Sequence, residues 1–484
     1  MQILAQYALD LAAQLGATYS DVRCIEQQSQ EILTKDETVA RVALGSSSGI
    51  GVRVLVKGGW GFASTQHLTR AGVAAAVKRA VAAGAASATC RSQPVRLADE
   101  PVYQASWISP HLIDPFTVSI ETKIDVLMKA ARATLAVKGI TLAQGFMSFT
   151  KDVKLFASST GSRIAQTFIR SGCGIEAHAT GKDDRQKRSW PSSFGGQQES
   201  SGWEMVARWD LPGNAPRIAE EAVALLTAPA CPQTQTDLIL GGSQLALQIH
   251  ESMGHPSELD RALGWEVNFA GGSFLTPDQL GILSYGSPLV NLVADATAPG
   301  ALGSFGFDDE GVAAQRVPLV KDGVFCGYLS SRETADEIGL SRSGGMMRAE
   351  SWNYTPIIRM TNVSLAPGNA GTLEDIIADT DNGIFMETNR SWSIDQQRYQ
   401  FQFSTEVGWE IKKGKRGRML KNCSYAGITP LFWNACDAIG DRRDYIDWGV
   451  PNCGKGQPMQ TMWTGHGAAP SRFRNITVGI AHAG

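Results

Sequence analysis

Two histidines in one short segment put the tightest constraint on how this chain can fold. They begin and end the run His250-Glu251-Ser252-Met253-Gly254-His255. This run closes a segment in which Leu245, Ile249 and Met253 recur every four positions and predict a helix that Ser243 caps and Pro256 ends. On a regular α-helix, at about 100° per residue, the two imidazoles would point about 140° apart. A single π turn, which closes from residue i to i+5, would return both to one face. The segment is therefore either a distorted turn whose two histidines can bind the same ion or a helix end with two solvated histidines.

The same segment carries the residue types of a zinc centre. Zinc binds neutral imidazole nitrogens at about 2.0–2.1 Å, and a carboxylate such as Glu251 can take a proton from water beside the ion. A catalytic zinc site needs three protein ligands as well as water, so two histidines are not enough. The candidates for the third ligand are Glu258, Asp260, Glu266, Cys453 and His466. We expect Cys453 to lie in an exposed loop, where a metal or Lys455 would favour its thiolate.

Three other patterns indicate chemistry less specifically. Residues 45–49 match the G-x-S-x-G pattern of serine hydrolases, but a strand at 52–56 follows where that motif requires a helix. Cys453 and His466 can be read as a thiol-protease pair, which would leave the histidine pair unexplained. The basic run 412–418 is interpreted as a solvated hairpin tip rather than a nucleic-acid contact.

Charge and cysteine usage narrow the partners and the compartment. The 484 residues include 44 Lys and Arg against 47 Asp and Glu, a net charge of −3, so no overall positive field favours nucleic acid. Eight cysteines without a repeated spacing predict reduced thiols. We see no basic leader and no apolar run of about 18 residues, and we expect a cytoplasmic protein without a membrane span.

The hydrophobic patterns predict an α+β protein in three regions. Region 1–105 is expected to be an α+β domain with an antiparallel sheet, including a hairpin over 52–63 and a helix over 70–86. Region 106–232 is expected to be a second α+β block, with a helix over 118–138. Region 233–484 is expected to be rich in strands and to carry the metal-binding helix, with an Asp-Gly hairpin near 317–329 and a largely irregular tail.

Several motifs taken together resemble the TldD/PmbA peptidase family, most strongly from about residue 237 to the end. In the C-terminal half they are His250-Glu251-x-x-x-His255, Asp308-Asp309-Glu310-Gly311, Arg348-x-x-Ser351-Trp352, Arg359-Met360-Thr361-Asn362 and Asn452-Cys453-Gly454-Lys455. Near the N-terminus, Gly49-Ile50-Gly51-Val52-Arg53 and Gly58-Gly59-Trp60-Gly61-Phe62 resemble the opening domain of the family.

The resemblance implies a zinc metallopeptidase of the TldD type. It implies zinc held by His250, His255 and Cys453, with Glu251 as general base; all four positions are intact here, whereas the partner subunit of the family's heterodimers lacks the metal ligands. Members are associated with peptide maturation and degradation of unfolded peptides, and were once described as modulators of DNA gyrase. We therefore expect a zinc-dependent peptidase acting on extended peptides, as a homodimer or with a TldE/PmbA-like chain.

Some alternatives stay open. Arg348 can bind a substrate carboxylate or carbonyl, or it can form a structural ion pair. The rival from another class is a non-catalytic peptide-binding or regulatory subunit. A further rival is a zinc hydrolase whose third ligand is Glu258 or Glu266.

Overall fold

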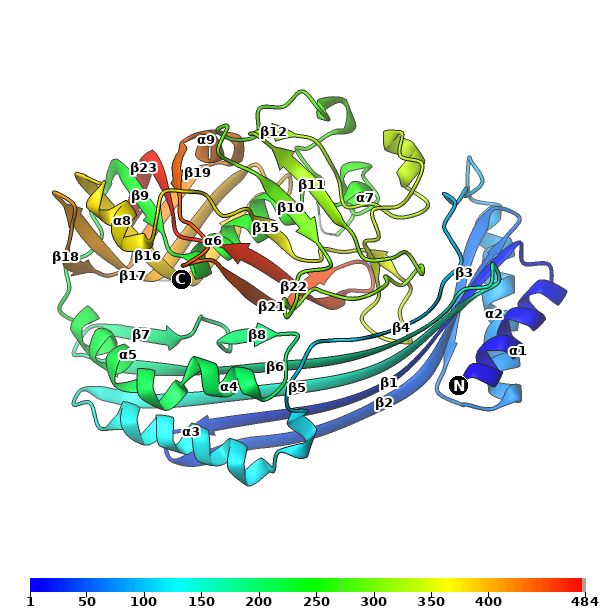
Figure 1. Cartoon of the computed structure of the whole chain (residues 1–484), viewed down its shortest axis with the longest axis horizontal. Helices are drawn as coiled ribbons and strands as arrows, with labels where there is room; N and C mark the ends of the chain where they lie inside the picture. The colour runs from blue at the N-terminus through cyan, green and yellow to red at the C-terminus, as the bar shows by residue number, and fades with distance from the viewer. Residues whose placement is uncertain (270, 481–484) are drawn as a thin grey trace.

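Four very long strands dominate the N-terminal half of the protein. A computed structural model describes residues 1–269 and 271–480. Strands β1 (Tyr19–Lys35), β2 (Thr38–Val56), β5 (Ile140–Ser158) and β6 (Arg163–Thr180) have 17 to 19 residues each, about three times the usual strand length. In Figure 1 they curve together beneath the C-terminal strands. The expected α+β class, with an antiparallel N-terminal sheet and a strand-rich C-terminal part, is confirmed.

These strands belong to one eight-stranded sheet that takes in both expected N-terminal regions. Its order is β3-β2-β1-β5-β6-β4, with β7 and β8 also paired to β6. β1 pairs with β5 along its length, from Asp21 opposite Ser158 to Lys35 opposite Gln144. Regions 1–105 and 106–232 therefore share a sheet, and their separate folding stays a prediction. The shorter strands are β3 (Gly59–Thr65), β4 (Gln104–Ile108), β7 (Arg185–Trp190) and β8 (Gln197–Glu199).

Helices cover the two ends of this sheet (Figure 1). The expected helices over 70–86 and 118–138 are present as α2 (Arg70–Ala88) and α3 (Ile120–Leu135), each capped by a hydroxyl side chain. The others are α1 (Gln2–Gln14), α4 (Glu204–Trp209) and α5 (Leu211–Leu225). No described helix combines the length and the apolar character that a membrane crossing needs.

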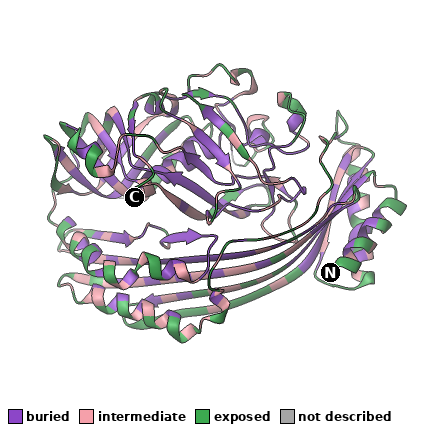
Figure 2. Cartoon of the chain, viewed as in Figure 1, coloured by how far each residue is buried: buried purple, intermediate pink, exposed green. Residues whose placement is uncertain are grey.

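The C-terminal part contains a seven-stranded sheet of order β16-β9-β23-β19-β17-β18, with β20 paired to β23. Its members are β9 (Thr234–Leu240), β16 (Asn382–Ile394), β17 (Gln400–Lys412), β18 (Lys415–Leu420), β19 (Cys423–Ile428), β20 (Cys436–Ile439) and β23 (Ser471–Ile480). Next to it lies a four-stranded sheet of β10 (Leu292–Asp295), β11 (Arg316–Lys321), β12 (Val324–Phe325) and β15 (Val363–Leu365). Figure 2 shows buried residues concentrated in this block.

The expectation of an irregular tail is wrong. The tail forms β21 (Ile446–Lys455), β22 (Gln460–Ala468) and β23, while residues 481–484 lie outside the described part. β23 pairs with β9, more than 200 positions earlier, so the pattern of the tail alone does not reveal its partner. The glycines that indicated loops are tolerated because close neighbours fill their places: a Cβ on Gly465 would lie 2.2 Å from Asn362 Oδ1.

Three smaller expectations have mixed outcomes. The Asp-Gly turn joins β11 to β12 with φ of 49° and 81°, although β12 has two residues only. The basic run 412–418 is a hairpin tip between β17 and β18, where Arg418 pairs with Glu410 at 2.7 Å. Residues 45–49 lie inside β2, so the serine-hydrolase pattern has no strand-turn-helix context.

The motifs of the two halves meet at one interface. Gly49 faces the Trp352 ring, and the indole Nε1 donates to Ser47 Oγ at 2.9 Å. Arg53 pairs with Glu310 at 3.1 Å and with Asp21 at 2.7 Å, all buried. The N-terminal glycines and the C-terminal acidic motif therefore join the sheet to the block that carries the histidines.

We predict that Gly49→Ala weakens this junction. A Cβ at Gly49 would lie 2.2 Å from the Trp352 ring, so either the ring or the strand must move. Overpacking of this kind costs about 1–3 kcal/mol of unfolding free energy, measured by urea denaturation. Gly479→Ala is the control, because its Cβ would come no closer than 3.6 Å to another atom. Equal urea midpoints for Gly49→Ala and wild type would contradict this account.

Candidate metal centre

A π turn carries the histidine motif. Helix α6 (Gly242–Ile249) passes directly into a π turn over His250–Gly254, and the His255 N–H donates to the His250 carbonyl oxygen at 3.1 Å. This i to i+5 bond is the distortion that the spacing requires for both imidazoles to share a face. The two ring centroids are 4.9 Å apart. Gly241 is the residue that precedes the first helical residue, Gly242. Ser243 is the second residue of the helix, so the expected cap by Ser243 is wrong.

The turn is held from outside the helix as well. Trp433 Nε1 donates to Ser252 Oγ at 3.0 Å, and Tyr285 Oη donates to the Ser252 carbonyl oxygen at 2.9 Å. A Cβ at Gly254 would lie 2.1 Å from Met360 Sδ, so this position needs glycine. The fold therefore supplies hydrogen bonds and space that a π turn in isolation lacks.

Strand β21 brings Cys453 to the two imidazoles. The possible ligand atoms of His250, His255 and Cys453 lie within 4.8 Å of one another, with Cys453 Sγ 3.7 Å from His255 Nε2. The expectation of an exposed loop at Cys453 is wrong, because the residue is 4% exposed in a strand paired with β22. Arg359 also donates to the Cys453 carbonyl oxygen and holds the strand there.

His466 sets the tautomer of His250. His466 Nδ1 lies 2.8 Å from the Val363 carbonyl oxygen, which can only accept, so this nitrogen carries the hydrogen. Burial and the neighbouring His250 hold the pKa of His466 well below its usual range, so the ring is neutral and its Nε2 accepts. That Nε2 is 2.7 Å from His250 Nδ1, which must donate. His250 Nε2 is thus left with its lone pair free.

A carboxylate has the same effect on the second histidine. His255 Nδ1 lies 3.1 Å from Glu258 Oε2, and Lys455 Nζ lies 3.5 Å from Glu258 Oε1. Burial opposes ionisation of Glu258, but Lys455, His255 and Arg261 together hold its pKa below the usual value. The carboxylate therefore accepts the Nδ1 hydrogen and leaves His255 Nε2 free on the side of Cys453.

The electrostatics favour the metal-binding form of each of the three groups. Burial lowers the pKa of His250 to about 4 and lowers that of His255, so both imidazoles are neutral near pH 7. Burial opposes a thiolate at Cys453, but neighbouring groups, among them the Arg359 guanidinium, lower the pKa of the thiol below its usual value. Neutral imidazoles and a thiolate are the forms that bind zinc.

This donor set fits zinc. Tetrahedral coordination with Zn–N near 2.0 Å and Zn–S near 2.3 Å places N and S about 3.5 Å apart, close to the 3.7 Å between His255 Nε2 and Cys453 Sγ. In the described part of the chain, this is the one group of three or more His, Cys, Asp or Glu residues placed closely enough to hold a metal ion. Glu258 and His466 instead bind the Nδ1 atoms of the histidines, and Asp260 binds Lys455 at 2.6 Å.

The three residues open into a cavity of about 270 Å³. Glu251 also lines it, and Arg398 Nη1 donates to Glu251 Oε2 at 2.6 Å. The rings of Phe194 and Trp392 pack edge to face at its wall, with centroids 5.5 Å apart. Sequence reasoning missed Arg398, Phe194 and Trp392, because they are remote from the histidines in the chain and no local pattern distinguishes them.

Arg348 lies elsewhere. Its Nη1 donates to the carbonyl oxygens of Met360 and Trp463, both at 2.7 Å, and its side chain lines a small internal space beside Asp309 rather than the cavity. Burial, with Arg170 and Arg359 nearby, lowers the pKa of Arg348 to about 9. A substrate-binding role for Arg348 stays a prediction.

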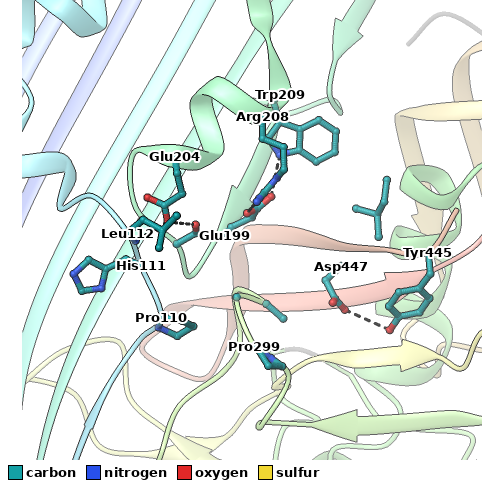
Figure 3. Close-up of a pocket in the computed structure, with 14 residues that line it drawn as sticks. Pro110, His111, Leu112, Glu199, Glu204, Arg208, Trp209, Pro299, Tyr445 and Asp447 are labelled. Atoms are coloured by element: carbon teal, nitrogen blue, oxygen red, sulfur yellow. Dashed lines mark hydrogen bonds and ion pairs between the residues drawn. The ribbon is translucent and has the colours of Figure 1, made fainter. Parts of the chain in front are cut away.

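A second, larger cavity of about 610 Å³ lies between the N-terminal sheet and the C-terminal block (Figure 3). Figure 3 shows Glu199 with Arg208, and Tyr445 with Asp447, on opposite sides of it. Trp209 lines this space and Trp448 lines the smaller cavity, and their ring centroids are 5.8 Å apart. None of the three candidate metal ligands lines the larger cavity, and all three line the smaller one.

Comparisons with known proteins agree along the whole chain. Three family profiles match: the PmbA/TldA metallopeptidase domain 1 at residues 20–84, the central domain at 113–228 and the C-terminal domain at 233–479. A metalloprotease of Methanocaldococcus jannaschii is 29% identical over 90% of this chain and 92% of its own length. A zinc metalloprotease TldD homolog of Saccharolobus solfataricus is 23% identical over 50% of this chain and 51% of its own length.

The solved structures extend the likeness to the fold. The crystal structure of TldE from Thermococcus kodakarensis has a TM-score of 0.73 to this chain at 15% identity. The superposition covers 98% of this chain and 100% of TldE. At this identity the likeness shows the fold alone.

We predict that His466→Ala weakens zinc binding about 10- to 100-fold, because His250 Nδ1 loses the acceptor that sets its tautomer. Competition with a fluorescent zinc chelator measures the affinity. His466→Gln can still offer a carbonyl oxygen and should keep most of the affinity. His178→Ala, which removes a surface histidine paired with Glu176, is the control. Zinc affinity within about threefold of wild type in a folded His466→Ala protein would exclude this role.

Proposed function

Because this chain belongs to the PmbA/TldD metallopeptidase family, we propose that it is a zinc-dependent peptidase that hydrolyses unfolded or extended peptides. The observation that carries the proposal is the presence of His250, His255, Cys453 and Glu251 in one cavity. The first three residues would hold the ion, and Glu251 follows directly after a ligand on the same π turn. A carboxylate in this position is suited to act as general base.

The two oxygens of Glu251 have different surroundings. Oε2 accepts from Arg398, whereas Oε1 makes no hydrogen bond within the described residues. When bound, zinc supplies a Lewis acid that polarises a carbonyl and lowers the pKa of water. Glu251 Oε1 then accepts a proton as the water oxygen adds to the carbonyl carbon, and returns it to the amine nitrogen as the C–N bond breaks.

The cavity favours a peptide chain over a folded protein. Its volume of about 270 Å³ holds only a few residues, and the metal ligands are 3–5% exposed. Phe194 and Trp392 are 48% and 42% exposed at its wall and offer an apolar surface to side chains. A scissile bond would reach the histidines only in an extended segment.

We further propose that the protein acts as a dimer, with a second copy or with a TldE/PmbA-like chain. The shared fold of this chain and TldE supports a related partner. Light scattering of the purified chain, alone and mixed with such a partner, should give a mass of two chains in one of the two samples. A monomer in both would contradict the proposal.

We predict that Glu251→Gln lowers cleavage of an unstructured peptide about 10²- to 10⁴-fold while about one zinc per chain is kept. Glu220→Gln, at an exposed position of α5 outside the cavity, is the matched control. Cleavage by the wild type should stop with a chelator and return with zinc, and His250→Ala and Cys453→Ala should lose the metal.

Each alternative has its own outcome. Full activity of Glu251→Gln, or cleavage that a chelator does not affect, would overturn the mechanism. Zinc retained in Cys453→Ala but lost in Glu258→Ala or Glu266→Ala would favour the other ligand sets. Bound zinc and bound peptide without cleavage would favour a peptide-binding subunit.

A further inference from the structure

We propose that Arg398 is a catalytic residue that donates a hydrogen bond to the carbonyl oxygen of the scissile peptide bond while it holds Glu251 in place. The inference rests on the proposed peptidase function and adds the electrophilic donor that this function needs on the substrate oxygen. Hydrolysis of a peptide bond builds negative charge on that oxygen, and a fixed donor beside it lowers the barrier. Arg398 keeps its own protons throughout and supplies charge and hydrogen bonds only.

The backbone places Arg398 at the tip of the hairpin between β16 and β17. Its N–H donates to the Asp395 carbonyl oxygen at 3.0 Å, and Thr429 Oγ1 donates to the Arg398 carbonyl oxygen at 2.9 Å. The Asp395 side chain also accepts from the Tyr399 N–H at 2.8 Å. These bonds hold Arg398 at a φ of 64°, a conformation that is uncommon for a long side chain. A strained residue kept in place at a cavity is a sign of function.

The guanidinium group of Arg398 makes few hydrogen bonds and is mostly buried. Of its five N–H groups, one has a partner within the described residues, Glu251 Oε2 at 2.6 Å. The side chain is 17% exposed, and its Nε is buried without a hydrogen-bond partner. The buried Arg188, in contrast, donates to three carboxylates, those of Glu221, Glu387 and Glu406. Arg398 therefore has donors to spare, whereas Nε, Nη1 and Nη2 of Arg188 all donate.

Arg398 lines the cavity in which a substrate would lie, and one of its unused nitrogens is not buried. Nη2 makes no hydrogen bond within the described part and is not among the buried unpartnered atoms, so it is the open end of the group. Among the described residues that line the cavity, Arg398 is the only lysine or arginine. It binds Glu251, and the candidate metal ligands line the same cavity. A neutral carbonyl that gains negative charge is the ligand that suits this position, because Glu251 already balances the charge of Arg398.

The test compares Arg398→Ala and Arg398→Lys with the control Arg390→Ala. Arg390 lies on β16, and its side chain binds Asn422 outside the cavity. The probe is an internally quenched, unstructured peptide with acetylated and amidated ends, and each variant is loaded with zinc. We expect Arg398→Ala to lose about 10²- to 10³-fold in kcat with KM within about threefold. Arg398→Lys should recover little, because an ammonium cannot hold Glu251 and the carbonyl in one plane.

Two further measurements separate catalysis from a purely structural role. Guanidine hydrochloride at millimolar concentration should partly restore cleavage by Arg398→Ala and should not restore Glu251→Gln. A phosphinic analogue of the cleaved peptide, which copies the tetrahedral geometry, should bind Arg398→Ala about 10²-fold more weakly than wild type by calorimetry. Zinc content and the thermal midpoint should match those of Arg390→Ala.

The inference is overturned if kcat of Arg398→Ala stays within about threefold of wild type, or if only KM changes. Unchanged affinity for the phosphinic peptide would also overturn it. A loss that appears only for peptides with a free C-terminal carboxylate would show that Arg398 binds that carboxylate instead. If the wild type does not cleave, or Glu251→Gln cleaves equally well, the proposed function itself fails. Loss of cleavage in Glu251→Gln with full cleavage in Arg398→Ala rejects only the role of Arg398.

Discussion

One backbone hydrogen bond, from the His255 N–H to the His250 carbonyl oxygen, decides whether the site can exist. It replaces the usual i to i+4 bond by an i to i+5 bond, and so turns His255 back toward His250. Such a turn is unfavourable in an isolated helix. Here Trp433 and Tyr285 bind Ser252 in the middle of the turn, and Met360 fills the space that Gly254 leaves. The core of the C-terminal block therefore stabilises the geometry on which the chemistry depends.

The groups around the candidate ligands matter as much as the ligands. His466 and Glu258 occupy the Nδ1 atoms of the two histidines, so both Nε2 lone pairs face Cys453 and the cavity. Lys455 and Arg261 surround Glu258, and Arg359 lies beside Cys453, so buried negative charge is matched by buried positive charge. A buried charge without such partners would be too costly to keep. The site is thus prepared electrostatically, and a bound zinc ion would add to an arrangement already in place.

Local patterns predicted local structure well. The helices α2 and α3 and the glycine-containing turns were recoverable because capping hydroxyls and Asp-Gly pairs act within a few residues. The tail was misread, because β21 to β23 form their pairs with each other and with β9 far upstream, and glycines inside them indicated loops. For the same reason Cys453 was expected on the surface and is buried in a strand. Long-range pairing leaves little trace in any short window of sequence.

The amino-acid sequence by itself determined which chemistry was available: two imidazoles and a carboxylate in one segment, at a spacing that requires a π turn to share an ion. It left the third ligand open among five residues until the family resemblance selected Cys453. The tertiary structure decided which of the five lies beside the histidines, since Cys453 is 198 positions from His255 in the chain and 3.7 Å away in space. It also decided that His466 and Glu258 support the ligands and that Arg398 reaches Glu251. The reason is physical: residue type and local spacing are properties of a segment, whereas distances between remote side chains depend on how whole sheets pack.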